Sequence, residues 1–394
     1  MQKRVLFGGG GHSELPMIEE AKKLGWYVIT TGTNEDGLGH ALADEYVYGN
    51  WSDKDFLLEL AKEKKVDAIV SGCNDFSYIA TAYVCEWLGL PGHDSYETAQ
   101  IIHHKDKFRK LVESLGIRTP KMLEVASIKE IHDAIEKIGL PVVVKPTDLT
   151  GGKGVKICHD IEEIDDAFND AISATRRNHI LVEEFIDGKN AGACFILKNH
   201  KVVYSVFDDE QYYINKYLVE GANSPCRCLN NAGEYRLISD VEKISRHLNL
   251  VDGLFHLQFI ADKNGNPVII DPCRRAPGDL WILACKFVSG INYPLEVFKA
   301  EIGEEIDDHS QSAHSFIARQ CIMTNRTGII KSIFVDDYLK EHMIHELVWG
   351  KPGDYVDDFM KYKAGILITE YDDIDEIDYV TKRLHDLVKI EFEE

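Results

Sequence analysis

The sequence predicts a mixed α/β and α+β protein whose N-terminal domain is built on a doubly wound parallel sheet. The chain has 394 residues, enough for two or three domains of about 100 to 200 residues each. Over the first hundred residues, apolar strand-like runs alternate with helical segments, the order typical of a parallel sheet. Further along, apolar runs are joined directly by turns, which predicts antiparallel hairpins in the later domains.

The composition indicates a globular protein without a broad surface for polyanions. Hydrophobic residues make up 44% of the chain, and the net charge is −22 at pH 7. A surface this negative repels nucleic acids and acidic membranes. The first apolar run is too short for a signal peptide, and none approaches the stretch of about 18 residues that spans a bilayer. We therefore expect a cytoplasmic protein that binds neither nucleic acid nor membrane.

The nine cysteines are irregularly spaced, which predicts reduced thiols rather than a disulfide framework. Cys226 and Cys228 form a C-x-C pair, but no second Cys or His pair follows at ligand spacing. The sequence alone therefore argues against a zinc site at this pair.

The expected elements of the N-terminal domain follow one another in βα order. Strands are expected at KRVLFGG, WYVITT and VDAIVSG, with helices at about residues 13–24, 54–64 and 76–88. The glycine run from Gly8 to Gly11 is either a phosphate loop at a helix N-terminus or a tight turn, and its spacing is not G-x-G-x-x-G. A helix at about 106–115, closed by Gly116 and Pro120, marks the start of the second domain.

The second domain is expected to be mixed. Strands are predicted near 121, 141–145 and 180–184, and helices at 128–138, 161–174 and 234–248. Hairpin strands follow within 193–207, and LFHLQFIA pairs with PVIID across the turn DKNGN, whose Asn-Gly is a strong hairpin signal. Beyond about 305, SFIARQCIM, GIIKSIF and a helix near 374–387 predict a smaller α+β unit.

One strand of the second domain ends in a lysine and is followed by a glycine loop. Lys145 closes the run VVVK, and GGKG supplies Gly151, Gly152, Lys153 and Gly154. Glycines let backbone amides approach a phosphate, and the lysines add positive charge. The pattern favours a flap over nucleotide phosphates, and the alternative is a solvated lysine before a hairpin turn.

Two further segments have the residue types of a nucleotide and metal site. In ILVEEFIDG, an apolar strand leads to Phe185 and Ile186, which suit an adenine, while Glu183 and Glu184 point to opposite faces, so one of them is expected to be only solvated. In the later hairpin, Gln258 lies on one strand and Asp271 on the next, in positions suited to Mg²⁺. The alternative for the hairpin is an edge with surface charge.

The order of these segments resembles the ATP-grasp superfamily. The quoted features are Asp106-Lys107 opening a helix, Lys145, GGKGV, VEEFIDG, and a metal-binding hairpin that ends in R-x-P-G-D. The chain is most similar to carboxylate–amine ligases of the carbamoyl phosphate synthetase and L-amino acid ligase type. The resemblance implies a pre-ATP-grasp domain (1–102), an ATP-grasp domain (103–305, with an ATP lid at about 120–185) and a C-terminal subdomain (306–394). It also argues against a phosphate-binding role for the Gly8 to Gly11 loop, because ATP does not bind in the first domain of that family.

The resemblance also implies residue roles. It assigns the ATP site to Lys107, Lys145, Gly151, Gly152, Lys153, Gly154, Glu183, Glu184, Phe185, Ile186 and Asn190. It assigns the metal site to Gln258, Asp271 and Cys273. It places Asn223, Ser224 and Arg227 near the acceptor substrate and Arg275 at the substrate carboxylate, with Lys145 and Arg275 catalytic. Arg274 and His256 are further substrate-site candidates from the residues themselves, and the alternative for His256 is a packed, hydrogen-bonded histidine. Trp281 and Arg319 are further candidates to line that pocket.

Two positions depart from the pattern of the family. Asp271-x-Cys273 stands where Glu-x-Asn is usual, and a thiol is a poor ligand for Mg²⁺. Asn190 stands where a ribose-binding glutamate is usual. These departures leave open the alternative that the protein binds a nucleotide without catalysing a reaction.

The function that the resemblance implies is an ATP-dependent ligase. It would activate a small carboxylic acid, with an amino acid favoured, as an acyl phosphate, couple it to an amine, and release ADP and phosphate. ATP and Mg²⁺, or Mn²⁺ in its place, would be the cofactors. The alternatives are a bicarbonate-dependent carboxylase or carbamoyl phosphate synthetase-like enzyme, and the non-catalytic protein. Its partners would be the two small substrates, with a homodimer as the default oligomer.

Overall fold

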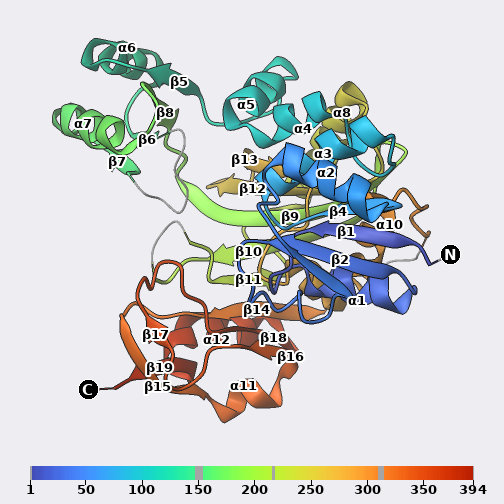
Figure 1. The fold of residues 1–394 in the computed structure, drawn as a ribbon. Helices are drawn as coiled ribbons and strands as arrows, with labels where there is room; N and C mark the ends of the chain where they lie inside the picture. The colour runs from blue at the N-terminus through green and yellow to red at the C-terminus, as the bar shows by residue number, and fades with distance from the viewer. Residues whose placement is uncertain (1, 147–153, 215–217, 309–314, 394) are drawn as a thin grey trace.

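The computed structural model describes residues 2–146, 154–214, 218–308 and 315–393, arranged as Figure 1 shows. The N-terminal domain contains the predicted parallel sheet, in the strand order β3-β2-β1-β4. This sheet confirms the α/β prediction. Its elements are β1 (Arg4–Gly8), α1 (Leu15–Lys23), β2 (Tyr27–Gly32), β3 (Glu45–Tyr48), α2 (Lys54–Lys64), β4 (Ala68–Ser71) and α3 (Asp75–Leu88).

The glycine run after β1 forms a tight turn. The Gly11 amide donates to Oε2 of Glu14 at 2.8 Å, and Oε1 of Glu14 accepts from the Cys73 amide at 2.7 Å. The Glu14 carboxylate therefore occupies one of the amides that a phosphate loop would offer to a ligand. Of the two interpretations of this run, the structure favours the turn.

A small unit with its own core follows the helices α4 (Tyr96–His103) and α5 (Lys105–Ser114). Its antiparallel sheet has the order β5-β8-β6-β7 and packs against α6 and α7. All the buried apolar residues of this core come from residues 125–182, and the unit projects at the upper left of Figure 1. The elements are β5 (Met122–Val125), α6 (Ile128–Ile138), β6 (Val142–Pro146), β7 (Lys156–Cys158), α7 (Ile164–Ala174) and β8 (Ile180–Glu184). The sequence assigned this range to the ATP lid.

An antiparallel sheet of eight strands forms the centre of the molecule, in the order β13-β12-β9-β10-β11-β14-β18-β16. Side chains alternate across it, so Phe195, Phe255 and Phe259 pack on the side of α8. Ile196 and Leu254 pack on the other side, with α9 and α10. The elements up to residue 301 are β9 (Gly188–Lys198), β10 (Lys201–Gln211), β11 (Gly221–Ser224), α8 (Asn231–Leu248), β12 (Gly253–Asp262), β13 (Pro267–Cys273), α9 (Trp281–Ser289) and α10 (Tyr293–Glu301).

The C-terminal segment both extends the central sheet and builds a second, smaller one. β14, β18 and β16 continue the central sheet, whereas β17, β15 and β19 form a separate three-stranded sheet. The elements are β14 (Phe316–Ile322), β15 (Gly328–Val335), α11 (Asp337–Glu341), β16 (Met343–Val348), β17 (Tyr355–Val356), β18 (Gly365–Tyr371), α12 (Ile374–Leu387) and β19 (Val388–Phe392). Within the described residues no helix has the length and apolar character needed to cross a bilayer.

Arg274 joins the N-terminal domain to the central sheet. The side chain is 3% exposed, and its Nε donates to Asp94 at 2.8 Å. Its guanidinium also donates to the carbonyls of Val251 and Leu254, and Asp94 accepts from the hydroxyl of Tyr78. The sequence placed Arg274 in the substrate site, but the structure places it in this buried network, because Arg274 and Arg275 leave the end of β13 in different directions.

Replacing Arg274 with methionine should lower the free energy of unfolding by about 3–5 kcal/mol, since Asp94 would be left as a buried, unpaired charge. Urea unfolding followed by tryptophan fluorescence measures the change. Arg246→Met is the matched control, because Arg246 is half-exposed and pairs with Glu242 at 3.3 Å on the surface of α8. That change should cost at most about 1 kcal/mol. Equal losses in the two variants would contradict a structural role for Arg274.

Candidate active site

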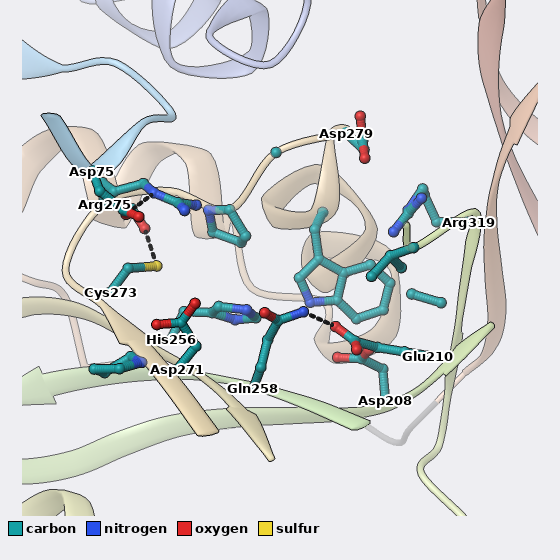
Figure 2. A pocket seen from close by; sticks show the side chains of 16 residues that line it. Asp75, Asp208, Glu210, His256, Gln258, Asp271, Cys273, Arg275, Asp279 and Arg319 are labelled. Atoms are coloured by element: carbon teal, nitrogen blue, oxygen red, sulfur yellow. Dashed lines mark hydrogen bonds and ion pairs between the residues drawn. The ribbon is translucent and has the colours of Figure 1, made fainter. Parts of the chain in front are cut away.

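A cavity of about 200 Å³ opens on the α9 side of the central sheet. Figure 2 shows that polar side chains from several distant segments point into it. The lining residues that bear charge or a titratable group are Asp75, Asp208, Glu210, His256, Asp271, Cys273, Arg275, Asp279 and Arg319. Gln258 and Trp281 also line it.

The hairpin of β12 and β13 brings the predicted metal residues together. Gln258 lies directly opposite Asp271, and His256 lies opposite Cys273. Because side chains alternate along a strand, His256 and Gln258 share the face that lines the cavity. Nε2 of Gln258 donates to Oε1 of Glu210 on β10 at 2.6 Å. The amide oxygen of Gln258 takes no part in this hydrogen bond.

Three cations lie between this hairpin and the lid, two of them largely buried and one, Lys105, half-exposed. Lys145 on β6 pairs with Glu183 on β8 at 2.6 Å, and Arg109 on α5 approaches the same carboxylate at 3.8 Å. Lys105 pairs with Asp271 at 3.1 Å. Three cations thus face two carboxylates, and the excess of positive charge suits a polyphosphate.

The electrostatics of these groups are strongly coupled. Burial lowers the pKa of Lys145 despite the attraction of Glu183, whereas the charge of Asp271 raises the pKa of Lys105. Burial favours the neutral form of Glu183, but Lys145 and Arg109 outweigh it, so the pKa of Glu183 lies below its usual value. The site therefore keeps Glu183 ionised between cations.

The lysine that reaches the hairpin is not the one that the sequence indicated. Lys107 donates to Oε1 of Gln100 at 3.0 Å on the exposed side of α5. Lys105 lies two residues earlier, about 200° around the helix, and faces Asp271. The sequence showed that a lysine opens this helix but not how the helix is turned toward the sheet.

The other residues predicted for ATP occupy the end of β8 and the start of β9. Glu183 is buried, while Glu184 turns outward and forms a bidentate pair with Arg118 at 2.6 and 2.9 Å. The expectation that one of the two glutamates is only solvated is therefore wrong. Phe185 and Ile186 are half-exposed, and Asn190 lies opposite Ile260 in the sheet.

Part of the predicted phosphate flap lies outside the described residues. Gly151, Gly152 and Lys153 belong to that part, and Gly154 is described. Gly154 has φ +71°, and a Cβ there would come within 2.8 Å of the ring of Pro146. A glycine is therefore required at this position by both conformation and space.

Arg275, His256 and Cys273 form one side of the cavity. Nε of Arg275 donates to Asp75 at 2.9 Å, at the start of α3. Burial lowers the pKa of His256 to about 3, and Nδ1 of this neutral ring lies 3.2 Å from the sulfur of Cys194. Burial raises the pKa of Cys273 to about 12, so its thiol is protonated near neutral pH. A neutral thiol does not suit Mg²⁺, whereas the oxygens of Gln258 and Asp271 do.

The remaining predicted substrate residues do not line the cavity. Asn223 donates to Thr381 at 2.6 Å, and Ser224 donates to the carbonyl of Phe207 at 3.0 Å. Arg227 pairs with Asp378 on α12 at 2.6 Å. These side chains hold the β11 segment against its neighbours.

Two acids on β10 are central to the cavity, and the sequence analysis missed them. Asp208 is 2% exposed, and its Oδ1 has no hydrogen-bond partner among the described residues. Burial and then the charge of Glu210 raise the pKa of Asp208 well above its usual value. The signal was present, because Tyr204, Val206, Asp208 and Glu210 alternate along one strand and so share a buried face.

The opposite wall of the cavity holds a second arginine. Arg319 on β14 is buried, and its Nη1 donates to the carbonyl of Glu220 at 3.2 Å. Its Nε has no partner within the described part of the chain. Nearby, Asp279 accepts from Lys363 at 2.5 Å and lies 3.4 Å from the ring of His12.

Comparison with known proteins relates part of the chain to a known ATP-binding domain. Residues 104–275 match the model of the carbamoyl-phosphate synthase L chain, ATP binding domain. The formate-dependent phosphoribosylglycinamide formyltransferase of Prochlorococcus marinus is 30% identical over 188 residues, 47% of this chain and 48% of that enzyme. The chain thus spans less than half the length of this curated relative.

Two solved structures share the fold over the whole chain. Phosphoribosylglycinamide synthetase from Anaerococcus prevotii superposes with a TM-score of 0.82 at 23% identity, covering 100% of both chains. L-amino acid ligase from Bacillus licheniformis gives 0.81 at 19% identity, covering 100% of this chain and 99% of that one. The chain therefore contains an ATP-binding domain of the ATP-grasp family and has the fold of the ATP-grasp ligases.

Proposed function

We propose that this protein is an ATP-dependent ligase that activates the carboxylate of an amino acid and couples it to an amine, releasing ADP and phosphate. The observation that carries the proposal is the charge pattern of the cavity. Two arginines, Arg275 and Arg319, and two acids, Asp208 and Glu210, line one small space, beside a cluster of cations that suits a polyphosphate.

The ATP-binding half of the proposal rests on Lys105, Arg109 and Lys145. They would hold the phosphates between the lid and the central sheet, with Phe185 and Ile186 at the end of β8 available to the adenine. Gln258 and Asp271 would hold Mg²⁺, which offsets the repulsion between the terminal phosphate and a carboxylate. Their oxygen donors suit that ion.

The substrate half of the proposal rests on opposed charges. Arg275 and Arg319 would bind the carboxylate, and Arg319 has an unpartnered Nε for this purpose. Asp208 and Glu210 would bind the ammonium group, since burial raises the pKa of both acids and a substrate cation would stabilise their ionised forms. Bicarbonate has no positive group, so these acids favour an amino acid over the bicarbonate alternative.

The reaction that these groups support has two steps. A carboxylate oxygen attacks the γ-phosphorus, and the bond from that phosphorus to the bridging oxygen breaks, so ADP leaves. The amine nitrogen then attacks the acyl carbon, phosphate departs with the carbon–oxygen electron pair, and the amine gives up a proton. The cations of the site lower the cost of the first step, because their positive charge would offset the negative charge that develops on the phosphates.

The direct test is ADP release from purified protein with ATP, Mg²⁺ and a panel of amino acids, with and without a second amine. We expect ADP and phosphate in equal amounts, with a condensed product detected by mass spectrometry. Release with bicarbonate alone would indicate the carboxylase alternative. ATP binding without turnover under all conditions would support the non-catalytic alternative.

Lys105→Ala should reduce turnover by about a hundredfold or more, as expected for loss of one preoriented charge. Lys107→Ala should stay near the wild-type rate, because Lys107 faces Gln100. Lys110→Ala, on the same helix, serves as a neutral control. Steady-state ADP release measures all three, and a large loss in Lys107→Ala alone would restore the assignment made from the sequence.

Asp208→Asn should raise the KM for an amino acid at least tenfold while leaving the KM for ATP unchanged, since only the substrate ammonium loses a charged partner. The N-acetyl form of the same amino acid should be a poor substrate of the wild type. Glu242→Gln, a change of the same kind on α8, is the control. An unchanged KM in Asp208→Asn would refute the ammonium site and leave ATP use intact.

A further inference from the structure

Three metal-binding side chains converge on the other face of β10. Asp209 comes from the strand itself, and Cys226 and Cys228 come from the segment after β11. One ligand atom from each lies within 4.8 Å of the others. None of the three lines the cavity described above.

Two of the separations between these atoms are close to those of a tetrahedral site. The two sulfurs are 3.5 Å apart, and the sulfur of Cys226 is 3.2 Å from Oδ1 of Asp209. Tetrahedral Zn²⁺, with Zn–S of about 2.3 Å and Zn–O of about 2.0 Å, requires separations of about 3.8 and 3.5 Å. Expansion by a few tenths of an ångström would therefore admit the ion.

The carboxylate is already oriented by the backbone. Oδ2 of Asp209 accepts from the Arg227 amide at 3.0 Å, and Oδ1 accepts from the Cys228 amide at 3.2 Å. Such hydrogen bonds fix the direction of a ligand before the ion arrives. Cys226 is buried, while Cys228 and Asp209 are partly exposed, so an ion has a path from solvent.

We propose that Asp209, Cys226 and Cys228 bind a thiophilic divalent cation, Zn²⁺, with a water molecule as the fourth ligand. Binding converts two thiols to thiolates and releases two protons, so the ion, two thiolates and one carboxylate carry a net charge of −1. The proposal does not depend on the ligase activity. Asp209 lies between Asp208 and Glu210, so the bound ion would also fix the strand that carries both cavity acids.

The sequence argued against zinc here because it showed only two ligands. The third comes from a strand 17 residues earlier, and the pairing of β10 with β11 brings it to the cysteines. The spacing of residues along the sequence does not show that Asp209 approaches the two cysteines.

Equilibrium dialysis of the reduced protein against Zn²⁺, followed by metal analysis, tests the proposal. We expect one equivalent per chain for the wild type and for Arg227→Ala, which keeps all three ligands. The double variant Cys226→Ser/Cys228→Ser should lose that equivalent. No bound zinc in the wild type, or the same amount in the double variant, would overturn the proposal.

Two measurements on the wild-type chain remain decisive if the double variant does not fold. Co²⁺ should give the thiolate charge-transfer and visible bands of a tetrahedral site. Zn²⁺ should also protect Cys226 and Cys228 from alkylation, as mapped by peptide mass spectrometry, while Cys73 reacts equally with and without the ion. Full alkylation of the pair in the presence of Zn²⁺ would refute the site.

Discussion

The position of β12 between β9 and β13 is the constraint on which the site depends. Its register sets Gln258 opposite Asp271 and His256 opposite Cys273, and it also presents Phe255 and Phe259 to the core beneath α8. A slip of one residue would exchange these two sets of side chains between core and cavity. The apolar core therefore holds the polar site in register.

Around that strand, charge is arranged in two zones. Cations exceed carboxylates where Lys105, Arg109 and Lys145 meet the hairpin, whereas both acids and arginines line the cavity. Buried charges of this kind are costly unless a ligand or a partner compensates them. The first zone suits a polyanion and the second suits a zwitterion, which correspond to the ATP and the amino acid of the proposed ligase.

Much of the architecture could be predicted from the sequence, because its signals are local. The βα alternation predicted the parallel sheet, and Asn-Gly in the turn of Asp262–Asn266 predicted the hairpin that joins Gln258 to Asp271. The predictions that differ from the structure concern residues whose positions depend on tertiary packing. Lys105 rather than Lys107 reaches the site because of the rotation of α5, and Arg274 differs from Arg275 because of the path of the chain after β13. Identifying Asp208 as a cavity residue required both the alternation of side chains along β10 and the burial of that face of the strand.

The adjacency of Arg274 and Arg275 limits how this protein can diversify. One guanidinium fastens the N-terminal domain to the sheet, and its neighbour lines the cavity, so inserting or deleting a residue at the end of β13 would exchange their surroundings. A change of chain length there would therefore disturb the domain contact and the cavity together, whereas the turn at Asp262–Asn266, at the other end of the hairpin, lines no part of the cavity.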